Sequence, residues 1–120
     1  MTSRETVMAL REFALKMPGA YEDFPWGERV VKVNKKIFVF FGVDEDIDKG
    51  VNFGVKLPTS NDDALNFPFT KPARYNLGKS GWVSVRFSPD EDPPIELFER
   101  WIGESYRAIA PKRLIAQLKG

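Results

Sequence analysis

The hydrophobic periodicity of the chain changes twice, and these changes limit the folds open to it. Near the N-terminus, apolar residues recur at helical spacing and form a single stripe: Val7, Leu10, Phe13, Ala14 and Met17. Residues 29–87 are dominated by alternating patterns or continuous β-forming runs, and helical spacing returns over residues 95–109. The order helix, strands, helix predicts an α+β domain in which helices from both chain ends cover one antiparallel sheet.

Local signals predict where the helices begin. Thr2 and Glu5 have the spacing of a capping box. Pro93-Pro94 opens the last long helix, and Pro111 starts a shorter terminal one. A further short helix is expected after Ser60, with Ser60 as its capping residue.

Five segments have the composition of strands: residues 29–33, 37–41, 51–57, 73–77 and 82–87. The first two flank Asn34-Lys35 and form a hairpin, and the second is expected to be central because both its faces are apolar. The last two flank a glycine-containing turn. We therefore expect a two-layer α+β domain over residues 1–120. Its antiparallel sheet has about five strands, and the N- and C-terminal helices pack on one face.

The chain contains neither histidine nor cysteine. Disulfides, thiolate nucleophiles and imidazole bases or metal ligands are therefore excluded. The hydrophobic content of 42% is sufficient for a core without a metal or disulfide, and no cofactor is expected. Asp44, Asp46 and Asp48 alternate in an acidic loop, but an EF-hand needs Gly and Glu where this chain has Lys49 and Val55. No metal site is therefore predicted; the loop is interpreted as solvated, with adventitious binding of a hard cation by its crowded carboxylates as the alternative.

The remaining catalytic patterns are weak. Gly78-Lys79-Ser80 resembles the end of a phosphate-binding loop, but Ala73 stands where the motif needs its first glycine, and a strand pattern follows. Glu22, Asp23 and Glu28 could serve acid–base chemistry only with a shifted pKa and a defined separation. We expect no enzymatic activity and no catalytic residue.

The formal net charge of +1 conceals segments of opposite sign. Residues 24–43 carry four basic and one acidic residue, residues 44–48 carry four acidic residues, and residues 49–88 carry six basic and two acidic residues. The basic residues of the two predicted hairpins are candidates for phosphate contacts: Lys32, Lys35, Lys36, Arg74 and Lys79.

The three tryptophans have different sequence surroundings. Trp101 lies on the apolar stripe of the last long helix and Trp82 opens an apolar strand, so both are predicted in the core. Trp26 lies in a Pro-Trp-Gly loop and is a candidate for the border of a groove, together with Lys56.

A succession of short motifs resembles the MmcQ/YjbR family. In order they are Met17-Pro18-Gly19-Ala20 with Glu22, Pro25-Trp26-Gly27, Lys32-Val33, Lys36-Ile37-Phe38, Val55-Lys56-Leu57, Ala73-Arg74-Tyr75, Gly81-Trp82-Val83 and Glu104-Ser105-Tyr106. The resemblance implies a small bacterial cytoplasmic protein with a two-layer α+β fold similar to frataxin-like (CyaY-like) and secretion-chaperone-like folds. Members are commonly labelled DNA-binding, because their strands and loops look like a double wing, and the family pattern supplies no catalytic residue or cofactor.

Two functions follow as hypotheses. The first is a non-enzymatic DNA-binding module that contacts the phosphate backbone through its basic hairpins, with low sequence specificity. The alternative is a protein-interaction or chaperone-like module, suggested by the aromatic residues around Trp26. A cytoplasmic location is expected from the charged first helix and the absence of cysteine, no membrane span is expected, and the oligomeric state stays open.

Overall fold

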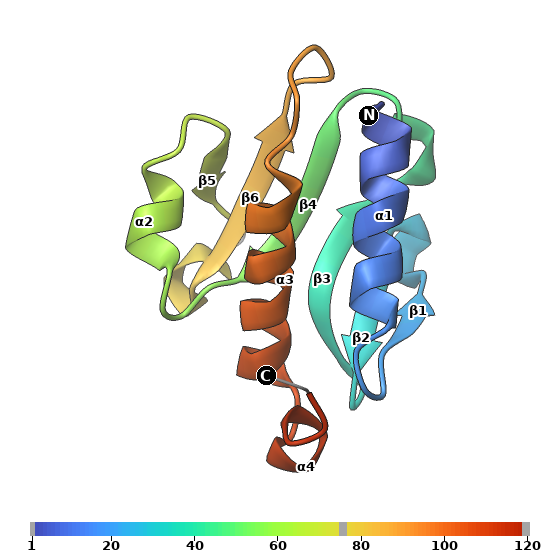
Figure 1. Cartoon of the computed structure of the whole chain (residues 1–120), viewed down its shortest axis with the longest axis vertical. Coiled ribbons are helices and arrows are strands. Elements are labelled where there is room, and N and C mark those ends of the chain that lie inside the picture. The colour runs from blue at the N-terminus through green and yellow to red at the C-terminus, as the bar shows by residue number, and fades with distance from the viewer. Residues whose placement is uncertain (1, 75–76, 119–120) are drawn as a thin grey trace.

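The computed structural model describes residues 2–74 and 77–118. Its elements, in chain order, are α1 (Ser3–Leu15), β1 (Tyr21–Asp23), η1 (Pro25–Gly27), β2 (Arg29–Val33), β3 (Lys36–Gly42), η2 (Asp44–Asp46), β4 (Val51–Lys56), α2 (Asn61–Leu65), β5 (Thr70–Pro72), η3 (Leu77–Ser80), β6 (Trp82–Phe87), α3 (Ile95–Ile109) and α4 (Lys112–Ile115), where η marks a 3-10 helix. Helices α1 and α3 lie side by side on one face of the sheet (Figure 1). The predicted two-layer α+β fold is confirmed. Within the described residues, no helix combines the length and apolarity needed to cross a membrane.

The helix starts largely follow the local signals. Thr2 caps α1: its hydroxyl accepts from the Glu5 N–H at 3.1 Å, and Glu5 accepts from the Thr2 N–H at 2.9 Å. Helices α3 and α4 begin directly after prolines, as predicted. Ser60 precedes α2, but its side chain does not cap that helix. The prediction of a Ser60 cap is wrong because its hydroxyl donates instead to Glu104 on α3, at 2.6 Å.

All strands pair antiparallel, in the order β1-β2-β3-β4-β6-β5. The β2–β3 hairpin is confirmed, with Asn34 and Lys35 at positive φ in its two-residue turn. The sheet has six strands rather than about five, because the short segment Tyr21–Asp23 adds an edge strand beside β2.

The predicted hairpin of residues 73–77 and 82–87 is wrong in one of its strands. The strand that pairs with β6 on this side is Thr70–Pro72, and Leu77–Ser80 forms a 3-10 helix instead of a hairpin turn. Residues 75 and 76, which belong to the predicted strand and to the motif ending in Tyr75, lie outside the described residues.

The core lies between the sheet and the two long helices. Edge-to-face ring pairs join the layers, with centroids 5.3 Å apart for Phe38 and Tyr106 and 5.0 Å apart for Phe53 and Phe98. Trp101 is buried in this core as predicted, at 4% exposure. Trp82 is also buried, at 8%, but it packs on Phe40, on the sheet face that α1 and α3 leave uncovered.

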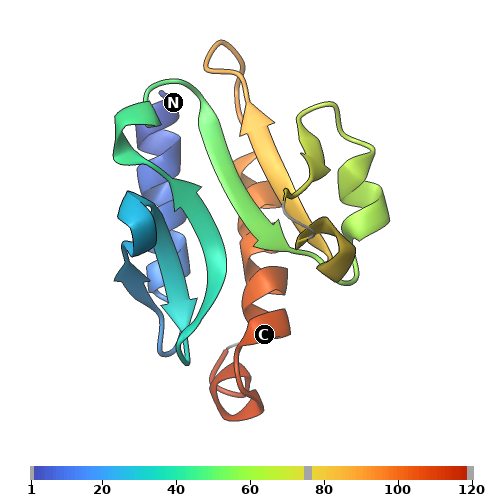
Figure 2. The same ribbon diagram turned by 180° about the vertical axis from the view of Figure 1, so that it is seen from behind.

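The strands β3 and β4 have the fewest residue pairs of any neighbours in the sheet, Val39–Val55 and Phe40–Gly54. Toward Gly42 the two strands diverge (Figure 2). At the opposite end of the contact, Ser105 of α3 stands between them. Its hydroxyl donates to the Phe38 carbonyl at 2.5 Å and accepts from the Lys56 N–H at 2.9 Å. A helix side chain thus replaces a direct strand-to-strand hydrogen bond.

We expect Ser105→Ala to lower the free energy of unfolding by about 2 kcal/mol, because it leaves a buried N–H and a buried carbonyl without their partner. Urea denaturation of the purified protein measures this loss. Ser84→Ala, on the uncovered sheet face, is the matched control and should cost less than about 0.5 kcal/mol. Equal losses in the two variants would contradict the bridging role.

Candidate functional site

The strands β4 and β6 present alternate side chains to the two faces of the sheet. Val83, Val85 and Phe87 of β6 point into the core, whereas Trp82, Ser84 and Arg86 point to the side without α1 and α3. We call that side the open face; Figure 2 is viewed toward it.

A groove of about 390 Å³ lies on the open face. Phe40 and Trp82 line it, with ring centroids 5.3 Å apart in an edge-to-face arrangement. Gly54 lies between their strands and also lines the groove. A Cβ atom there would meet the Phe40 side chain at 3.7 Å, so the absence of a side chain keeps this part of the floor low.

Three cationic side chains line the groove: Lys71 from β5, Arg74 from the segment after β5, and Arg86 from β6. All three are exposed. Within the described part of the chain, none of them has a carboxylate within salt-bridge distance. Glu28 is the one described carboxylate in the lining, so the groove carries an excess of positive charge.

The residues predicted for phosphate binding fall into separate places. Arg74 lines the groove, and Lys79 is exposed on η3, the 3-10 helix whose Leu77 also lines it. Lys35 and Lys36 lie at the β2–β3 turn, which β4 separates from β6 and β5 in the strand order. The structure therefore brings Arg74 and Lys79 together near β5 and β6, and it leaves Lys35 and Lys36 in the other half of the sheet, at the β2–β3 turn.

Lys32 is already neutralised by a neighbour. Its Nζ lies 2.6 Å from Asp23 Oδ2 on the adjacent edge strand. This hydrogen bond raises the pKa of Lys32 and, together with the Phe24 N–H, lowers the pKa of Asp23. Lys32 is consequently less available to a phosphate than the unpaired lysines.

The candidate groove residues Lys56 and Trp26 also lie apart. Lys56 pairs in register with Trp82, at the β4–β6 side of the open face. Trp26 lies in η1 with a φ of 55°, and 89% of it is exposed. Trp26 is not among the lining residues of this groove.

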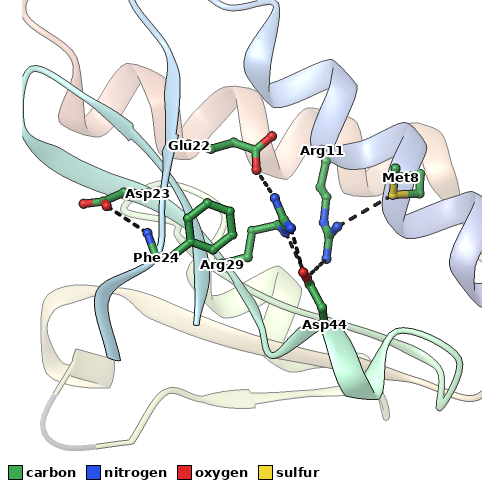
Figure 3. Close-up of polar contacts among 7 residues, drawn as sticks. All are labelled: Met8, Arg11, Glu22, Asp23, Phe24, Arg29 and Asp44. Carbon is green, nitrogen blue, oxygen red and sulfur yellow. Dashed lines mark hydrogen bonds and ion pairs between the residues drawn. The ribbon is translucent and has the colours of Figure 1, made fainter. Parts of the chain in front are cut away.

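The acidic loop is held by ion pairs that join it to α1 and β2 (Figure 3). Asp44 Oδ1 accepts from Arg11 Nη2 at 2.8 Å and from Arg29 Nε at 2.9 Å, and Asp44 Oδ2 accepts from Arg29 Nη2 at 2.6 Å. Arg29 also pairs with Glu22 and stacks over the Phe24 ring at 4.5 Å. The hydrogen bonds from Arg29, reinforced by Arg11, lower the pKa of Asp44 to about 2.

The remaining aspartates of the loop are also engaged. Asp46 pairs with Lys49 at 3.0 Å, and Asp48 pairs with Arg4 at 2.9 Å. Asp44 and Asp48 are exposed, as expected for a solvated loop, and their ion pairs also tie the loop to α1. Among residues 2–74 and 77–118, no group of three or more acidic side chains is arranged to hold a metal ion.

Comparison with protein families decides the relationship that the motifs suggest. The YjbR family model matches residues 15–108, which is most of the chain. The chain belongs to the YjbR family. The matched region includes the whole sheet and most of α3.

A solved structure supports the fold of this family member. A crystal structure of a Pseudomonas syringae protein, determined as a structural-genomics target, superposes with a TM-score of 0.60. The match covers 84% of this chain and 96% of the other, at 19% sequence identity, so the likeness concerns the fold. No match was found among curated proteins.

Sequence reasoning missed Lys71 and Arg86 as partners of Arg74 in this YjbR chain. The alternation of residues 82–87 carried a usable signal, since an arginine and a serine share one face of a strand whose other face is apolar. Lys71 had no such signal because its strand, Thr70–Pro72, is too short to show a period. Only the sheet order brings these cations together.

The Asp44 contacts predict an acid-sensitive contribution to stability. The folded-state pKa of about 2 is below the ordinary aspartate value of about 3.9, so the contribution is complete above pH 4 and disappears as the pH falls from about 4 to 2. We expect Asp44→Asn to cost about 1–2 kcal/mol at pH 7, a range that allows for the half-exposed carboxylate.

Urea titrations of both proteins at several pH values between 7 and 2.5 test this expectation. The difference between wild type and Asp44→Asn should shrink toward the acid end. Asp90→Asn, at an exposed carboxylate, is the control and should differ little from wild type at any pH. A difference for Asp44→Asn that stays constant throughout would refute the assignment.

Proposed function

We propose that this YjbR-family chain is a non-enzymatic, cytoplasmic DNA-binding module that contacts the phosphate backbone from its open face. The carrying observation is the groove lined by Lys71, Arg74 and Arg86, three exposed cations without a salt-bridge partner in the described structure. Phosphate backbones are bound chiefly by such unneutralised lysines and arginines.

The distribution of ion pairs supports this choice of surface. The cations on the α1 side, Arg4, Arg11 and Arg29, are paired with carboxylates, and so is Lys32 on β2. Lys79 and Lys56 lie beside the groove on the β4–β6 side and have no such partner in the described residues. The cations in and beside the groove are therefore free to attract an anion.

We expect the open face to bind DNA with low sequence specificity. The long helices α1 and α3 both lie on the opposite face, so neither is placed to enter a major groove from the open face. The exposed cations act mainly on phosphates, which carry no direct sequence information.

The state of the carboxylates favours a binding role over catalysis. Glu22 is paired with Arg29 and Asp23 with Lys32, and the lowered pKa of Asp23 is unsuited to a general acid at neutral pH. Glu28 lines the groove without a second carboxylate beside it in the described lining. Paired-carboxylate hydrolysis therefore has little support.

Salt-dependent binding to a 20-base-pair generic DNA duplex tests the proposal. If Lys71, Arg74, Lys79 and Arg86 neutralise four phosphates, the logarithm of the binding constant should fall with the logarithm of salt concentration at a slope of roughly −3.6. The double variant Lys71→Gln/Arg74→Gln should reduce this slope to roughly −1.8. Fluorescence anisotropy with labelled duplex measures both.

The control for this titration is Lys112→Gln/Arg113→Gln on α4, which removes the same charge from exposed positions outside the groove. It should leave the slope close to that of the wild type. Absence of binding at low salt, or an equal loss in the two double variants, would contradict binding at the groove.

A second candidate, a protein-interaction module, is favoured by the exposed aromatics beside the β1 edge. Trp26 is 89% exposed and Phe24 is 52% exposed. Trp26 also has a positive φ, a conformation that costs energy for a residue with a side chain. A strained, exposed tryptophan next to an edge strand is suited to an interface between copies of the chain.

Sedimentation velocity over a range of protein concentrations tests this candidate. Self-association should be detectable for the wild type and about thirtyfold weaker for Trp26→Ala. Leu77→Ala, which truncates an exposed apolar residue on η3, is the control and should associate like the wild type. A wild type that stays monomeric at high concentration would contradict the self-association proposal.

A further inference from the structure

A second cavity, of about 410 Å³, lies where β3 and β4 diverge. Its walls come from α1, the end of β3, the acidic loop and the start of β4. It shares Gly42, Asn52 and Arg86 with the open-face groove. Val7, Arg11 and Ile47 are among the residues that line only this second cavity. Where β3 and β4 separate, the sheet therefore leaves room for a second pocket on the α1 side.

Arg11 is the unusual group in this lining. Its side chain is 9% exposed, and only one of its nitrogens, Nη2, meets a carboxylate. Nη1 meets the thioether sulfur of Met8 at 3.6 Å, a weak acceptor, and the buried Nε has no hydrogen-bond partner in the described structure. Burial and the neighbouring charge of Arg29 lower the pKa of Arg11. A buried guanidinium normally satisfies more of its five N–H donors.

The carboxylate that pairs with Arg11, that of Asp44, also binds Arg29. Asp44 accepts two hydrogen bonds from Arg29 in addition to the one from Arg11. Elsewhere in the lining, Asp46 is occupied by Lys49, whereas Arg86 has no carboxylate partner in the described residues. Arg29 also pairs with Glu22, so the charges around Arg11 balance; the pocket keeps unpaired positive charge at Arg86 and poorly satisfied N–H donors at Arg11.

One part of the wall is apolar. Val7 of α1, Phe41 of β3 and Ile47 of the acidic loop are buried core residues that reach the pocket. Phe41 also lies under the Arg11 guanidinium, 5.8 Å from ring centroid to Cζ. Such a pocket suits a ligand that is anionic at one end and apolar at the other.

We propose that this pocket binds a small carboxylic acid with an apolar body, whose carboxylate accepts hydrogen bonds from the Arg11 guanidinium and whose body packs on Phe41 and Ile47. Arg86 adds attraction at the boundary with the open face. A carboxylate is a strong acceptor for a guanidinium, and it would offer Arg11 Nη1 a better partner than the Met8 sulfur. The proposal does not rest on the DNA-binding function, although the pocket shares Arg86 with the groove proposed for DNA.

Binding is tested with benzoate as the probe, followed by ¹H–¹⁵N NMR of the full chain. Saturable shifts are expected at the backbone amides of Gly42, Val43 and Gly50, which line the pocket. Benzyl alcohol, which has a similar body without the charge, should bind at least about tenfold more weakly. Inorganic phosphate should also bind more weakly because it cannot use the apolar wall.

Two variants locate the site. Arg11→Lys keeps a positive charge beside Asp44 but removes the guanidinium, and it should weaken benzoate binding about tenfold. Val43→Trp places a large ring at an exposed lining position, so it should block binding while leaving the core unchanged. The control Arg107→Gln removes one exposed charge on α3 outside the pocket and should have no effect.

Several outcomes would overturn the proposal: no saturable shift with benzoate, equal affinity for benzyl alcohol, tighter binding of phosphate than of benzoate, or unchanged binding in Val43→Trp. The DNA titration separates this failure from failure of the proposed function. Val43→Trp should leave the DNA slope intact, and Lys71→Gln/Arg74→Gln should leave benzoate binding intact.

Discussion

The hydroxyl of Ser105 links α3 to both central strands, and the shape of the sheet depends on that link. It occupies the position where β3 and β4 would otherwise exchange a hydrogen bond between Phe38 and Lys56. Beyond it the strands share only two residue pairs before they diverge. Because the bridging group belongs to a helix, α3 helps to hold together the two halves of the sheet, β1-β2-β3 and β4-β6-β5.

The divergence of β3 and β4 explains why the two cavities adjoin. Gly42 and Asn52 lie where the second further residue pair of a continuous ladder would form, and both residues line both cavities. One cavity extends over the open face toward Trp82, and the other extends toward α1 and Arg11. A fully paired sheet would close the passage between the two cavities. The candidate sites therefore follow from the incomplete pairing of β3 with β4.

Features specified by neighbouring residues could be predicted from the sequence. The capping box of Thr2 and Glu5, the two-residue turn at Asn34-Lys35 and the start of α3 after Pro94 each depend on contacts within a few positions. The fold class followed from the same local signals, because a change of hydrophobic period identifies helices and strands without knowledge of their partners.

Features that depend on distant partners were missed for the corresponding reason. The strands Tyr21–Asp23 and Thr70–Pro72 are three residues long, so only their pairing with β2 and β6 defines them. Ser60 has the right type and position for a cap, yet Glu104, 44 positions away, offers it a charged acceptor. A charge-assisted hydrogen bond is roughly twice as strong as a neutral one, which accounts for the loss of the cap.

The acidic loop determines where the free positive charge of the molecule lies. In the sequence, residues 44–48 stand between two basic segments and could neutralise either. The fold directs Asp44 toward Arg11 and Arg29, and Asp48 toward Arg4, so the loop neutralises the α1 side. The basic residues of β5, β6 and the segment between them have no comparable acidic segment folded against them in the described residues. A chain with a net charge of +1 can therefore present a locally cationic surface, because the acidic loop neutralises cations of α1 and β2, whereas Lys71, Arg74 and Arg86 keep no carboxylate partner in the described residues.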